Sequence, residues 1–542
     1  MSLPRFLERV VDATAPLLGG LDRDAVKAKL ETSSVTLLAG ELTEREPGHA
    51  GFLFAANLVA RLYPRICLIG SPDLVREATA EIVLINPRAD VTLSTDEKSK
   101  ATLGYEISVD NGAAVSVAAR GWNVYVDQPI ECDLDDDQAV VPAALLAAVL
   151  GVGELFRIVF ADELGHRGRS QPAPAAFNVV TLGAPRGALP TATDIPTGEF
   201  RLIGAGAIGQ AAAHTLALAG ARGTLVAIDP EKITLSNLQR YVLTRDTDVG
   251  SVKVELLRER LAKSSIDVIP APTRWHAGLV NAQRPTLVAL DSADARVGVQ
   301  ASLPGSIYNA WTQPADVGWS RHEDFGEEPC LACLYWPDRP VPSRHEQIAA
   351  AFGQHPLRIL AYLVHRNIPI GLPLPAGGIP PIPGLEVPPD AAEHWLATPL
   401  VDDIAAAAGI QAGALAAWRD RPLADVYQEG ICGGALLHLN VGEAPREVLV
   451  PLAHQSALAG VMLATELLIA RVPELRAARR ATVEGRFDVL AGPSQVMSRP
   501  RSRTTDCLCA DDVFLEAYRA WVQEPGQRRE RARVESEQMR WP

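Results

Sequence analysis

The sequence predicts an α/β protein with two Rossmann-like folds, the first degenerate and the second interrupted by an inserted segment of helices and loops that bears a cysteine. Three observations support this prediction. Apolar runs of strand length alternate with helical patterns in both halves. A glycine-rich turn, GAGAIG at 204–209, lies between a strand and a helix. The chain of 542 residues is also too long for one hydrophobic core.

The first half covers residues 1–190 and contains the strand-like run RICLIG at 65–70. A helix (SPDLVREATAEIVLI), two strands (ADVTLST and WNVYVD) and a helix of small residues near 142–162 follow it. Residues 170–198 are rich in Pro, Gly and Thr, which is typical of a linker. We therefore expect the first fold to end before this linker.

The second half, residues 191–542, opens with EFRLIGAGAIGQAAAHTLALAGA, which indicates a strand, a turn and a helix in succession. Further strands are expected at 223–229 and 286–295, and the second of these ends in acids. This succession is the βαβ rhythm of a parallel sheet.

Two later segments interrupt or follow this pattern. An insertion at about 340–430 contains a Pro-rich stretch at 371–390, expected to be an exposed loop, and a helical stretch at 399–420. The C-terminal segment, about 500–542, is expected to hold two cysteines, then a helix and a solvated tail.

The two halves resemble each other in places. ICLIG begins the first fold as RLIGAG begins the second, and AALLAAVLGVGELF (143–156) resembles SALAGVMLATELL (456–468). GSPDLV replaces the glycine turn in the first copy, where Pro72 and Asp73 would spoil an anion site. We expect the first copy to bind no phosphate. Two similar folds that arose without duplication are the alternative.

The net charge is −14, from 51 basic and 65 acidic residues. Nucleic acids require basic patches, so we expect no nucleic-acid partner. A basic protein partner is compatible with this charge, although a solvated acidic surface is the simpler interpretation. Seven cysteines do not make a disulfide framework in a chain this long, which indicates a reducing compartment where close cysteine pairs bind metal.

The most apolar stretch, residues 139–160, is interrupted by Glu154 and Arg157, and its uncharged part is shorter than the ~20 residues of a membrane span. We interpret it as a buried helix and expect no membrane contact. The N-terminus, MSLPRFLERVVDA, is charged and lacks the apolar core of a signal peptide. These features favour a cytoplasmic protein.

A nucleotide site is predicted at the glycine turn. Gly204, Gly206 and Gly209 follow a strand and open a helix, where the backbone can approach phosphates and the helix N-terminus offers N–H groups. Asp229 lies 20 residues after Gly209 at the end of the next strand, a position suited to binding ribose hydroxyls. A turn that only packs helix on strand is the alternative.

Polar residues after Asp229 indicate phosphate chemistry. Asn237, Gln239 and Arg240 lie within four residues, and Lys253 follows in VGSVK. Hydride transfer needs no such set, whereas attack on an ATP phosphate builds negative charge that Arg, Lys and Mg²⁺ stabilise. No GxxxxGK[ST] loop occurs in the chain, so these side chains would have to supply that charge. A solvated Arg and Lys are the alternative.

A magnesium ligand is expected after the later strand. LVALDSADAR offers Asp291 and Asp294 where ligands of open α/β sheets bind. We favour Asp294 as the ligand and expect Asp291 to cap the following helix.

Taken together, GAGAIG, the DPE–SNLQR run, VGSVK and LDSADA resemble the ubiquitin-activating-enzyme-like adenylyltransferases of the ThiF type. The resemblance is dense over about 195–340 and loose to about 470. It implies ATP-dependent adenylation of the C-terminal glycine of a small ubiquitin-like β-grasp protein. It also implies that two such folds pair face to face, within one chain or between chains as a homodimer.

The resemblance further implies roles for residues by position. Asp229 would hold the ribose, and Asp294 would hold Mg²⁺. The phosphate contacts would come from a polar set: Asn237, Gln239, Arg240 and Lys253. An N-terminal Arg of one fold would reach the ATP of the other, for which Arg5 and Arg9 are the candidates. Tyr241 and Ala295 depart from the family pattern without removing a charge. No catalytic His is needed, because an α-carboxyl with a pKa of about 3.3–3.7 is already ionised.

Four cysteines are candidate zinc ligands: Cys330, Cys333, Cys507 and Cys509. They form a CxxC and a CxC pair, and four thiolates suit tetrahedral Zn²⁺. The resemblance supports this interpretation, because such enzymes often carry a four-cysteine zinc. The short CxC spacing leaves a different fourth ligand open. Free buried cysteines and a redox CxxC are alternatives, but the sequence indicates no helix start directly at the motif.

Cys432 lies between glycines in YQEGICGGALLHL, after the insertion. Its thiolate could attack the acyl-adenylate and form a thioester for transfer to a conjugating enzyme. A small buried residue in a tight turn is the alternative. The arrangement resembles bacterial ubiquitin-like conjugation systems, which are often tied to antiphage defence.

Three rival functions remain. An adenylyltransferase for a sulfur-carrier protein would share every nucleotide residue and would not need Cys432. A nicotinamide-dependent oxidoreductase would bind NAD without cleaving ATP. A binding scaffold derived from an enzyme would show no ATP–pyrophosphate exchange.

Overall fold

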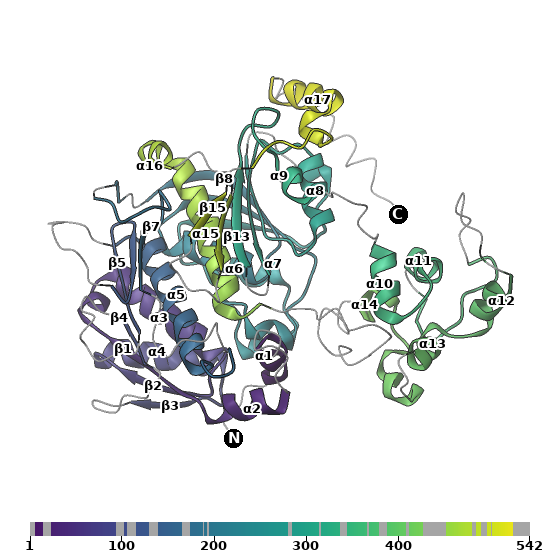
Figure 1. Ribbon diagram of the computed structural model, residues 1–542, viewed down its shortest axis with the longest axis horizontal. Helices are drawn as coiled ribbons and strands as arrows, with labels where there is room; N and C mark the ends of the chain where they lie inside the picture. Colours follow the sequence, from purple (N-terminus) through teal and green to yellow (C-terminus); the bar gives the residue numbers. More distant parts are fainter. Residues whose placement is uncertain are drawn as a thin grey trace. The chain divides into compact units, whose positions relative to one another are not determined.

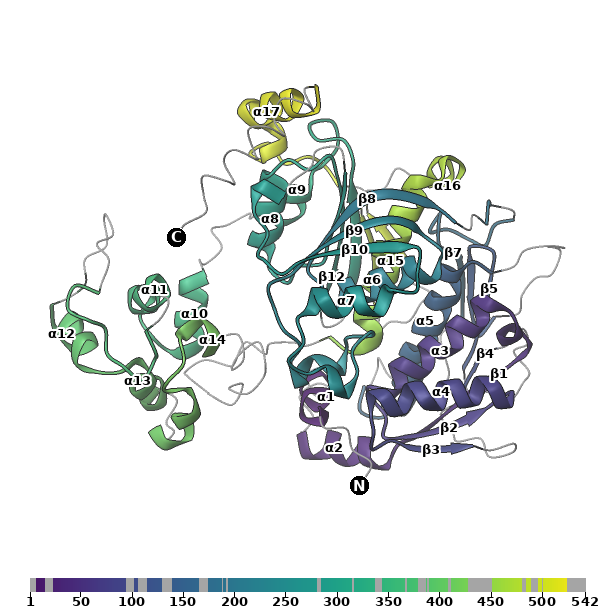
Figure 2. The ribbon, with the colours of Figure 1, turned by 180° about the vertical axis from the view of Figure 1, so that it is seen from behind.

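The computed structural model describes residues 6–14, 23–93, 102–105, 115–128, 139–164, 174–187, 189–191, 194–279, 284–313, 316–336, 344–365, 368–378, 387, 389–407, 411–426, 451–479, 484–488, 496–499 and 501–523 (Figures 1 and 2). The chain divides into two compact units. The larger unit is Met1–Trp336 with Val450–Pro542, and the smaller is Pro337–Leu449. Cys432 lies outside the described residues.

The first half of the larger unit forms a sheet in the order β3-β2-β1-β4-β5-β6-β7 among the described residues. Its strands are β1 Ser34–Ala39, β2 Arg65–Ile69, β3 Asp90–Leu93, β4 Thr102–Tyr105, β5 Val115–Arg120, β6 Asn123–Val126 and β7 Ala175–Asn178. Pairing is parallel from β3 to β5, whereas β6 and β7 are antiparallel to their neighbours.

The second half forms a sheet in the order β10-β9-β8-β11-β12-β13-β14-β15. Its strands are β8 Pro196–Ile203, β9 Arg222–Ile228, β10 Ile266–Ala271, β11 Pro285–Val288, β12 Ser306–Thr312, β13 Asp316–His322, β14 Glu484–Asp488 and β15 Val496–Arg499. Pairing is again parallel until the fifth position and antiparallel beyond it. The first seven positions of the two sheets therefore match, which confirms the predicted pair of Rossmann-like folds.

Helices and 3₁₀ turns accompany both sheets. The helices of the larger unit are α1 Leu7–Thr14, α2 Arg23–Thr32, α3 Glu46–Ala60, α4 Pro72–Ile85, α5 Val141–Val159, α6 Ala207–Leu218, α7 Lys253–Leu261, α8 Ala293–Ala301, α9 Leu331–Tyr335, α15 Ala453–Arg471, α16 Pro473–Ala478 and α17 Asp512–Gln523. The 3₁₀ turns are η2 Glu41–Glu44, η4 Leu235–Gln239, η5 Asp246–Asp248, η6 Ala277–Leu279 and η9 Leu508–Ala510.

Helix α4 shows how the sequence determines one of these elements. Pro72 lies in the first turn, where the missing N–H costs nothing and the fixed φ suits a helix. The buried side chains recur at the spacing of one helical face: Leu74, Val75, Ala78, Ile82 and Ile85. The predicted helix is confirmed.

Two expectations for the first half are wrong. By sheet position β1, and not the run at 65–70, is the counterpart of β8, and β2 is the counterpart of β9. β1 escaped notice because an acidic 3₁₀ turn follows it where β8 has glycines. The expected linker at 170–198 also contains β7, which pairs with β6 although Pro and Gly flank it.

The matching apolar segments form α5 and α15, each 19 residues long. Glu154 and Glu466 occupy the same position in the two helices. Both helices are long and apolar enough to cross a membrane by composition, but 83% and 94% of their apolar windows are buried inside the structure. The predicted buried helix near 142–162 is confirmed.

The two halves pair within the chain. α5 packs on α15, α3 packs on α5, and α6 packs on α15, so that one apolar core spans both halves. A Cβ on Gly460 of α15 would lie 2.4 Å from the Cβ of Ala211 in α6, so glycine permits this close packing. The rings of Phe177 in β7 and Phe487 in β14 also contact each other at a tilt of 58°, with ring centres 5.6 Å apart.

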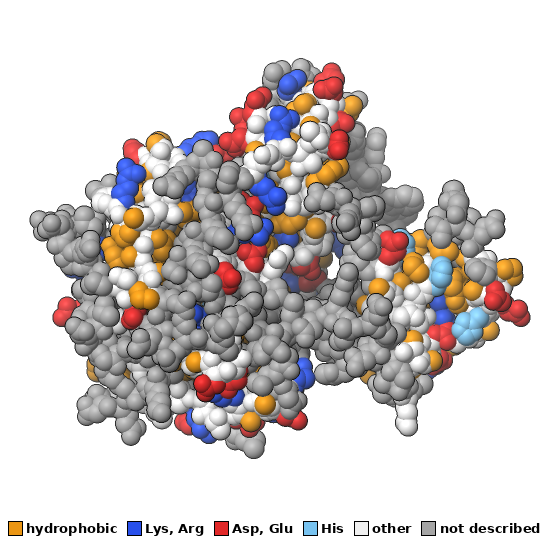
Figure 3. Space-filling model, in the orientation of Figure 1, with side chains coloured by type: hydrophobic (Ala, Val, Ile, Leu, Met, Phe, Trp, Pro, Cys, Tyr) orange, Lys and Arg blue, Asp and Glu red, His pale blue; other side chains and the backbone are white. Residues whose placement is uncertain are grey.

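The smaller unit is helical and has its own core. Its elements are α10 Arg344–Phe352, α11 Pro356–Val364, α12 Pro389–Ala397, α13 Leu400–Ala407, η7 Ala412–Trp418 and α14 Leu423–Val426. The predicted helical stretch at 399–420 forms α13 and η7. Buried Arg358 pairs with Asp403, which also lies 2.9 Å from exposed His394. Figure 3 shows histidine and apolar side chains on the surface of this unit.

Candidate nucleotide site and cysteine cluster

The predicted nucleotide residues follow three neighbouring strands of the second sheet. The glycine turn follows β8, Asp229 follows β9, and Asp294 lies beyond β11. The chain continues from β8 to β9 on one side and from β11 to β12 on the other, so β8 and β11 flank a topological switch point. The carboxyl ends of parallel strands at such a point form the usual ligand crevice.

Each glycine of the turn meets a steric demand. Gly204 has a φ of 93°, and a Cβ there would lie 2.5 Å from the carbonyl oxygen of Ala289. A Cβ on Gly209 would lie 2.0 Å from the carbonyl oxygen of Gly204. Gly206 is the N-cap of α6, with the Tyr241 hydroxyl 3.3 Å from the position of a Cβ. The turn therefore carries no side chains at its three glycines, and it places the N-terminus of α6 next to the end of β8.

Asp229 closes this turn. Its carboxylate accepts hydrogen bonds from the backbone N–H of Ala205 at 2.9 Å and of Glu231 at 2.8 Å. Burial raises its pKa, and the charge of Lys253, 3.9 Å away, acts in the opposite direction. The carboxylate lies beside the glycine turn, as a ribose-binding group requires.

Lys253 is buried and held in an acidic pocket. Its Nζ donates to Glu231 at 2.5 Å and lies 5.2 Å from the centre of the Tyr241 ring. Burial alone would lower its pKa, but Tyr241, Asp229 and Glu231 outweigh burial and raise it. The ammonium therefore keeps its charge inside the protein. Glu231 was missed in the sequence, although it stands only two residues after Asp229.

The polar run after Asp229 forms a turn. The side-chain oxygen of Asn237 accepts from the N–H of Thr234 and caps η4. Gln239 is buried and donates to the carbonyl of Pro451 at 3.2 Å. The guanidinium of Arg240 lies 5.8 Å from the centre of the Tyr241 ring. Asn237 and Gln239 thereby fix the turn on which they lie.

Asp294 is exposed in the first turn of α8. The N-cap of this helix is Ser292, whose hydroxyl accepts from the N–H of Ala295 at 3.0 Å, so the expectation that Asp291 caps it is wrong. Arg296 anchors the segment by donating to the carbonyls of Leu290 and Ala310.

Of the two N-terminal arginines, Arg9 lies in α1, which packs against η4. Its side chain is buried. Arg5 lies outside the described residues.

The first half has no counterpart of this site among its described residues. Only Gly70 and Ser71 separate β2 from α4, whereas residues 229–252 separate β9 from α7. Gly70 takes the place of Asp229, and η2 places Glu41 and Glu44 where the second half has its glycine turn. Carboxylates at this edge would repel a phosphate, so the physical reason for degeneracy differs from the one inferred from Pro72 and Asp73.

The four predicted cysteines meet in a buried cluster. The Sγ atoms lie 3.9 Å apart for Cys330 and Cys333, 3.6 Å for Cys330 and Cys507, and 3.4 Å for Cys333 and Cys509, and all four lie within 4.8 Å of one another. A tetrahedron with Zn–S bonds of about 2.3 Å has edges of about 3.8 Å. Hydrogen bonding to Cys333 and Cys507, with burial, raises the pKa of Cys330.

The sequence argument against a redox motif is wrong in one respect. α9 starts directly after Cys330, which is its N-cap. The second cysteine pair, contributed by the segment around η9, nevertheless surrounds the CxxC with two further thiols. This donor set fits a tetrahedral Zn²⁺ better than a two-cysteine redox centre.

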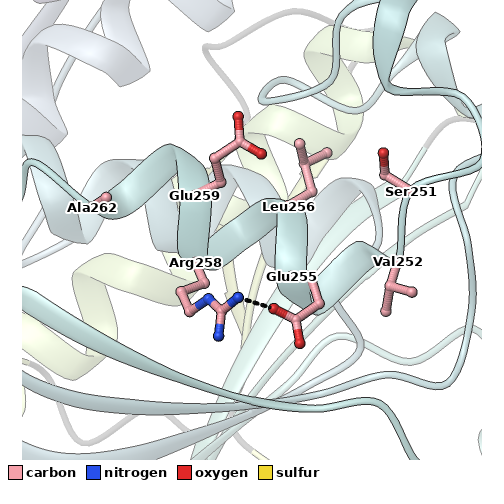
Figure 4. Close-up of a pocket in the computed structure, with 7 residues that line it drawn as sticks. All are labelled: Ser251, Val252, Glu255, Leu256, Arg258, Glu259 and Ala262. Carbon is pink, nitrogen blue, oxygen red and sulfur yellow. Dashed lines mark ion pairs between the residues drawn. The ribbon is translucent and has the colours of Figure 1, made fainter.

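A shallow pocket of about 630 Å³ lies along α7 (Figure 4). Its lining is Ser251, Val252, Glu255, Leu256, Arg258, Glu259 and Ala262. Glu255 and Arg258, one turn apart on α7, form an ion pair of 2.6 Å. None of the predicted nucleotide residues lines this pocket.

Comparisons with known proteins agree with this geometry. The model of the ThiF family matches residues 192–509. "Uncharacterized protein y4jF" of Sinorhizobium fredii is 28% identical over 96% of this chain and 97% of its own length. Two Escherichia coli proteins match about a quarter of the chain: molybdopterin-synthase adenylyltransferase, 38% identical over 24% of the chain, and sulfur carrier protein ThiS adenylyltransferase, 32% identical over 29%. These matches cover 57% and 64% of the two E. coli proteins.

Proposed function

The chain belongs to the ThiF family, and on this basis we propose that its second half is an ATP-dependent adenylyltransferase. Its substrate would be the C-terminal glycine of a small β-grasp protein of the ubiquitin-like or sulfur-carrier type. The observation that carries the proposal is the meeting of the glycine turn, Asp229 and buried, charged Lys253 at one edge of the second sheet.

Each group has a role in this reaction. The turn of Gly204, Gly206 and Gly209 leaves room for the nucleotide, and Asp229 binds the ribose. The phosphates are held by a polar set: Asn237, Gln239, Arg240 and Lys253. Asp294 holds Mg²⁺, which supplies charge neutralisation at the phosphates.

The chemistry requires no general base. An oxygen of the ionised glycine carboxylate forms a bond to the α-phosphorus, and the bond from this phosphorus to the bridging oxygen of pyrophosphate breaks. Pyrophosphate leaves with the electron pair, and an acyl-adenylate remains. Lys253, which pairs with Glu231, offsets the negative charge on the leaving group.

We further propose that the four-cysteine cluster binds Zn²⁺ as a structural ion. The cluster joins α9 to the segment around η9, two parts of the chain that are about 175 residues apart. A closed set of four thiolates leaves no open position for catalysis.

The step after adenylation has two candidates. In the first, the Cys432 thiolate attacks the acyl carbon, the bond to AMP breaks, and the thioester passes to a conjugating enzyme. In the second, the adenylate is consumed by a sulfur-transfer reaction without this thioester. The names of the E. coli relatives favour the second, and the glycines that flank Cys432 favour the first.

Calorimetric titration tests the nucleotide assignment. The full chain should bind ATP with Mg²⁺ and should show no heat with NAD; the reverse result would establish the oxidoreductase alternative. ATP–pyrophosphate exchange should then require a small β-grasp protein that ends in glycine. With that partner, Cys432→Ala should still form the adenylate, and loss of a thiol-labile adduct would support the thioester.

A further inference from the structure

We propose that the first half of the chain, whose described residues form no nucleotide site of their own, positions the phosphate-binding turn of the second half through Arg61. This inference rests on the proposed adenylyltransferase function. Arg61 is the first residue after α3. Its side chain contacts residues 238–244, which lie more than 170 positions later in the sequence.

Arg61 binds the turn through main-chain carbonyls. Its Nη1 donates to Leu238 at 2.5 Å, and its Nη2 donates to Val242 at 3.1 Å and to Thr244 at 3.0 Å. Its Nε donates to the side-chain oxygen of Asn57 at 3.0 Å, and the Asn57 amide donates in turn to the carbonyl of Val242 at 2.9 Å. One planar guanidinium thus fixes three carbonyls, that of Leu238 in η4 and those of Val242 and Thr244 just beyond it.

The charge of Arg61 is fully enclosed. Its side chain is 1% exposed, and burial lowers its pKa to about 9, with Glu81 and Asp248 acting in the opposite direction. The guanidinium is therefore still charged at neutral pH. A buried charge is tolerated only where its donors are satisfied, so displacement of the turn would carry a large energetic cost.

The second half holds the same turn from its own side. The Gln210 side-chain oxygen accepts from the N–H of Leu243 and from the hydroxyl of Thr244, both at 3.1 Å. Arg260 donates to the carbonyl of Leu243 at 3.1 Å. The turn is thus bound from both halves, and the first half contributes Arg61 together with Asn57.

Arg61 should influence the binding of the phosphates and not that of the adenosine. Leu238, whose carbonyl Arg61 binds, stands between Asn237 and Gln239, and Arg240 follows. The ribose and glycine-turn contacts come from β8 and β9 instead. Side chains that offset the charge of the phosphates do so well only when they are held in position before the nucleotide binds. Substitution of Arg61 should therefore weaken the affinity for ATP much more than the affinity for AMP.

The experiment compares Arg61→Gln with Arg157→Gln in the full chain. Arg157 is equally buried in the first half, but it pairs with Glu154 of its own helix. Calorimetry measures affinity for ATP with Mg²⁺ and for AMP, and amide hydrogen exchange reports on residues 235–244. We expect Arg61→Gln to weaken ATP binding at least tenfold and AMP binding less than twofold, with faster exchange in the turn. Arg157→Gln should leave the ratio of the two affinities unchanged.

Equal weakening of ATP and AMP by Arg61→Gln, or no change in either, would overturn the proposal. If Arg61→Gln does not fold, Asn57→Ser is measured in the same way, and about a threefold loss for ATP alone is expected. If the unmodified chain binds neither nucleotide, the proposed function fails. The exchange measurement then still decides whether Arg61 holds the turn.

Discussion

At the scale of single residues, the candidate nucleotide site depends on direct contacts among a few side chains, chiefly Asp229, Glu231 and Lys253. The glycines and Asp229 could be predicted because a strand, a turn and a strand-end acid follow one another in the sequence. The partnership of Glu231 with Lys253 could not, since the two stand 22 positions apart and meet only when the segment between them folds back. The contact of Gln239 with Pro451 spans 212 positions and leaves no local signal.

Glu231 should restrain nucleotide binding. Lys253 must give up part of its ion pair with Glu231 when it contacts a phosphate, and the carboxylate also repels the triphosphate. Glu231→Gln should therefore tighten binding of ATP with Mg²⁺ several-fold in a calorimetric titration. Glu255→Gln, which removes an acid of α7 paired with exposed Arg258, serves as the matched control and should change little. Weaker binding in Glu231→Gln would contradict this role.

Gly209 should tolerate no side chain. Gly209→Ala places a Cβ 2.0 Å from a backbone carbonyl that cannot rotate away, and overpacking of this kind costs about 1–3 kcal/mol. Urea unfolding should show this loss together with loss of ATP binding. Gly298→Ala in α8 has open space around its Cβ and should gain up to about 1 kcal/mol from helix propensity.

At the scale of elements, the long periodic helices and the strands β2, β3, β6 and β9 could be predicted, whereas β1 and β7 could not. α4, α5 and α15 have clear patterns of apolar residues. β1 and β7 were missed because β1 lacks the glycine turn that marked β8, and because β7 is a run of four residues between Pro and Gly. Short strands owe their existence to neighbours in the sheet, which sequence periodicity does not reveal.

We expect a metal ion bound by the four cysteines to be what holds α9 and the segment around η9 together. Plasma emission spectroscopy should find about one zinc per chain, and Cys509→Ser or a strong chelator should remove it and lower the melting temperature. Cys67→Ser is the control, because Cys67 lies in β2 of the first half. Full zinc content in Cys509→Ser would show that the fourth ligand is a different residue.

At the scale of the whole molecule, two histidines lie where the two halves meet, His454 being buried and His214 partly exposed. His214 of α6 contacts Phe54 of α3 with ring centres 5.7 Å apart, and His454 of α15 contacts Phe156 of α5 at 5.8 Å. Burial lowers the pKa of each to about 4. Both histidines are therefore neutral in the folded protein, and protonation would place a charge in the shared core.

Stability should fall between pH 6.5 and pH 4. In this window the unfolded chain binds a proton at each histidine and the folded chain does not, so each loses roughly 1.4 kcal/mol per pH unit. Urea midpoints across this range should show a shallower slope in a His214→Gln, His454→Gln double variant than in the unmodified protein. An identical slope in the two would mean that other groups account for the acid sensitivity.

Because the paired folds are covalently joined, their association is first order and does not weaken on dilution. A homodimer of identical subunits must carry two copies of every change in its sequence. In this chain a substitution in one half leaves the other as it was. Each molecule can therefore devote one fold to chemistry and free the second from the demands of substrate binding.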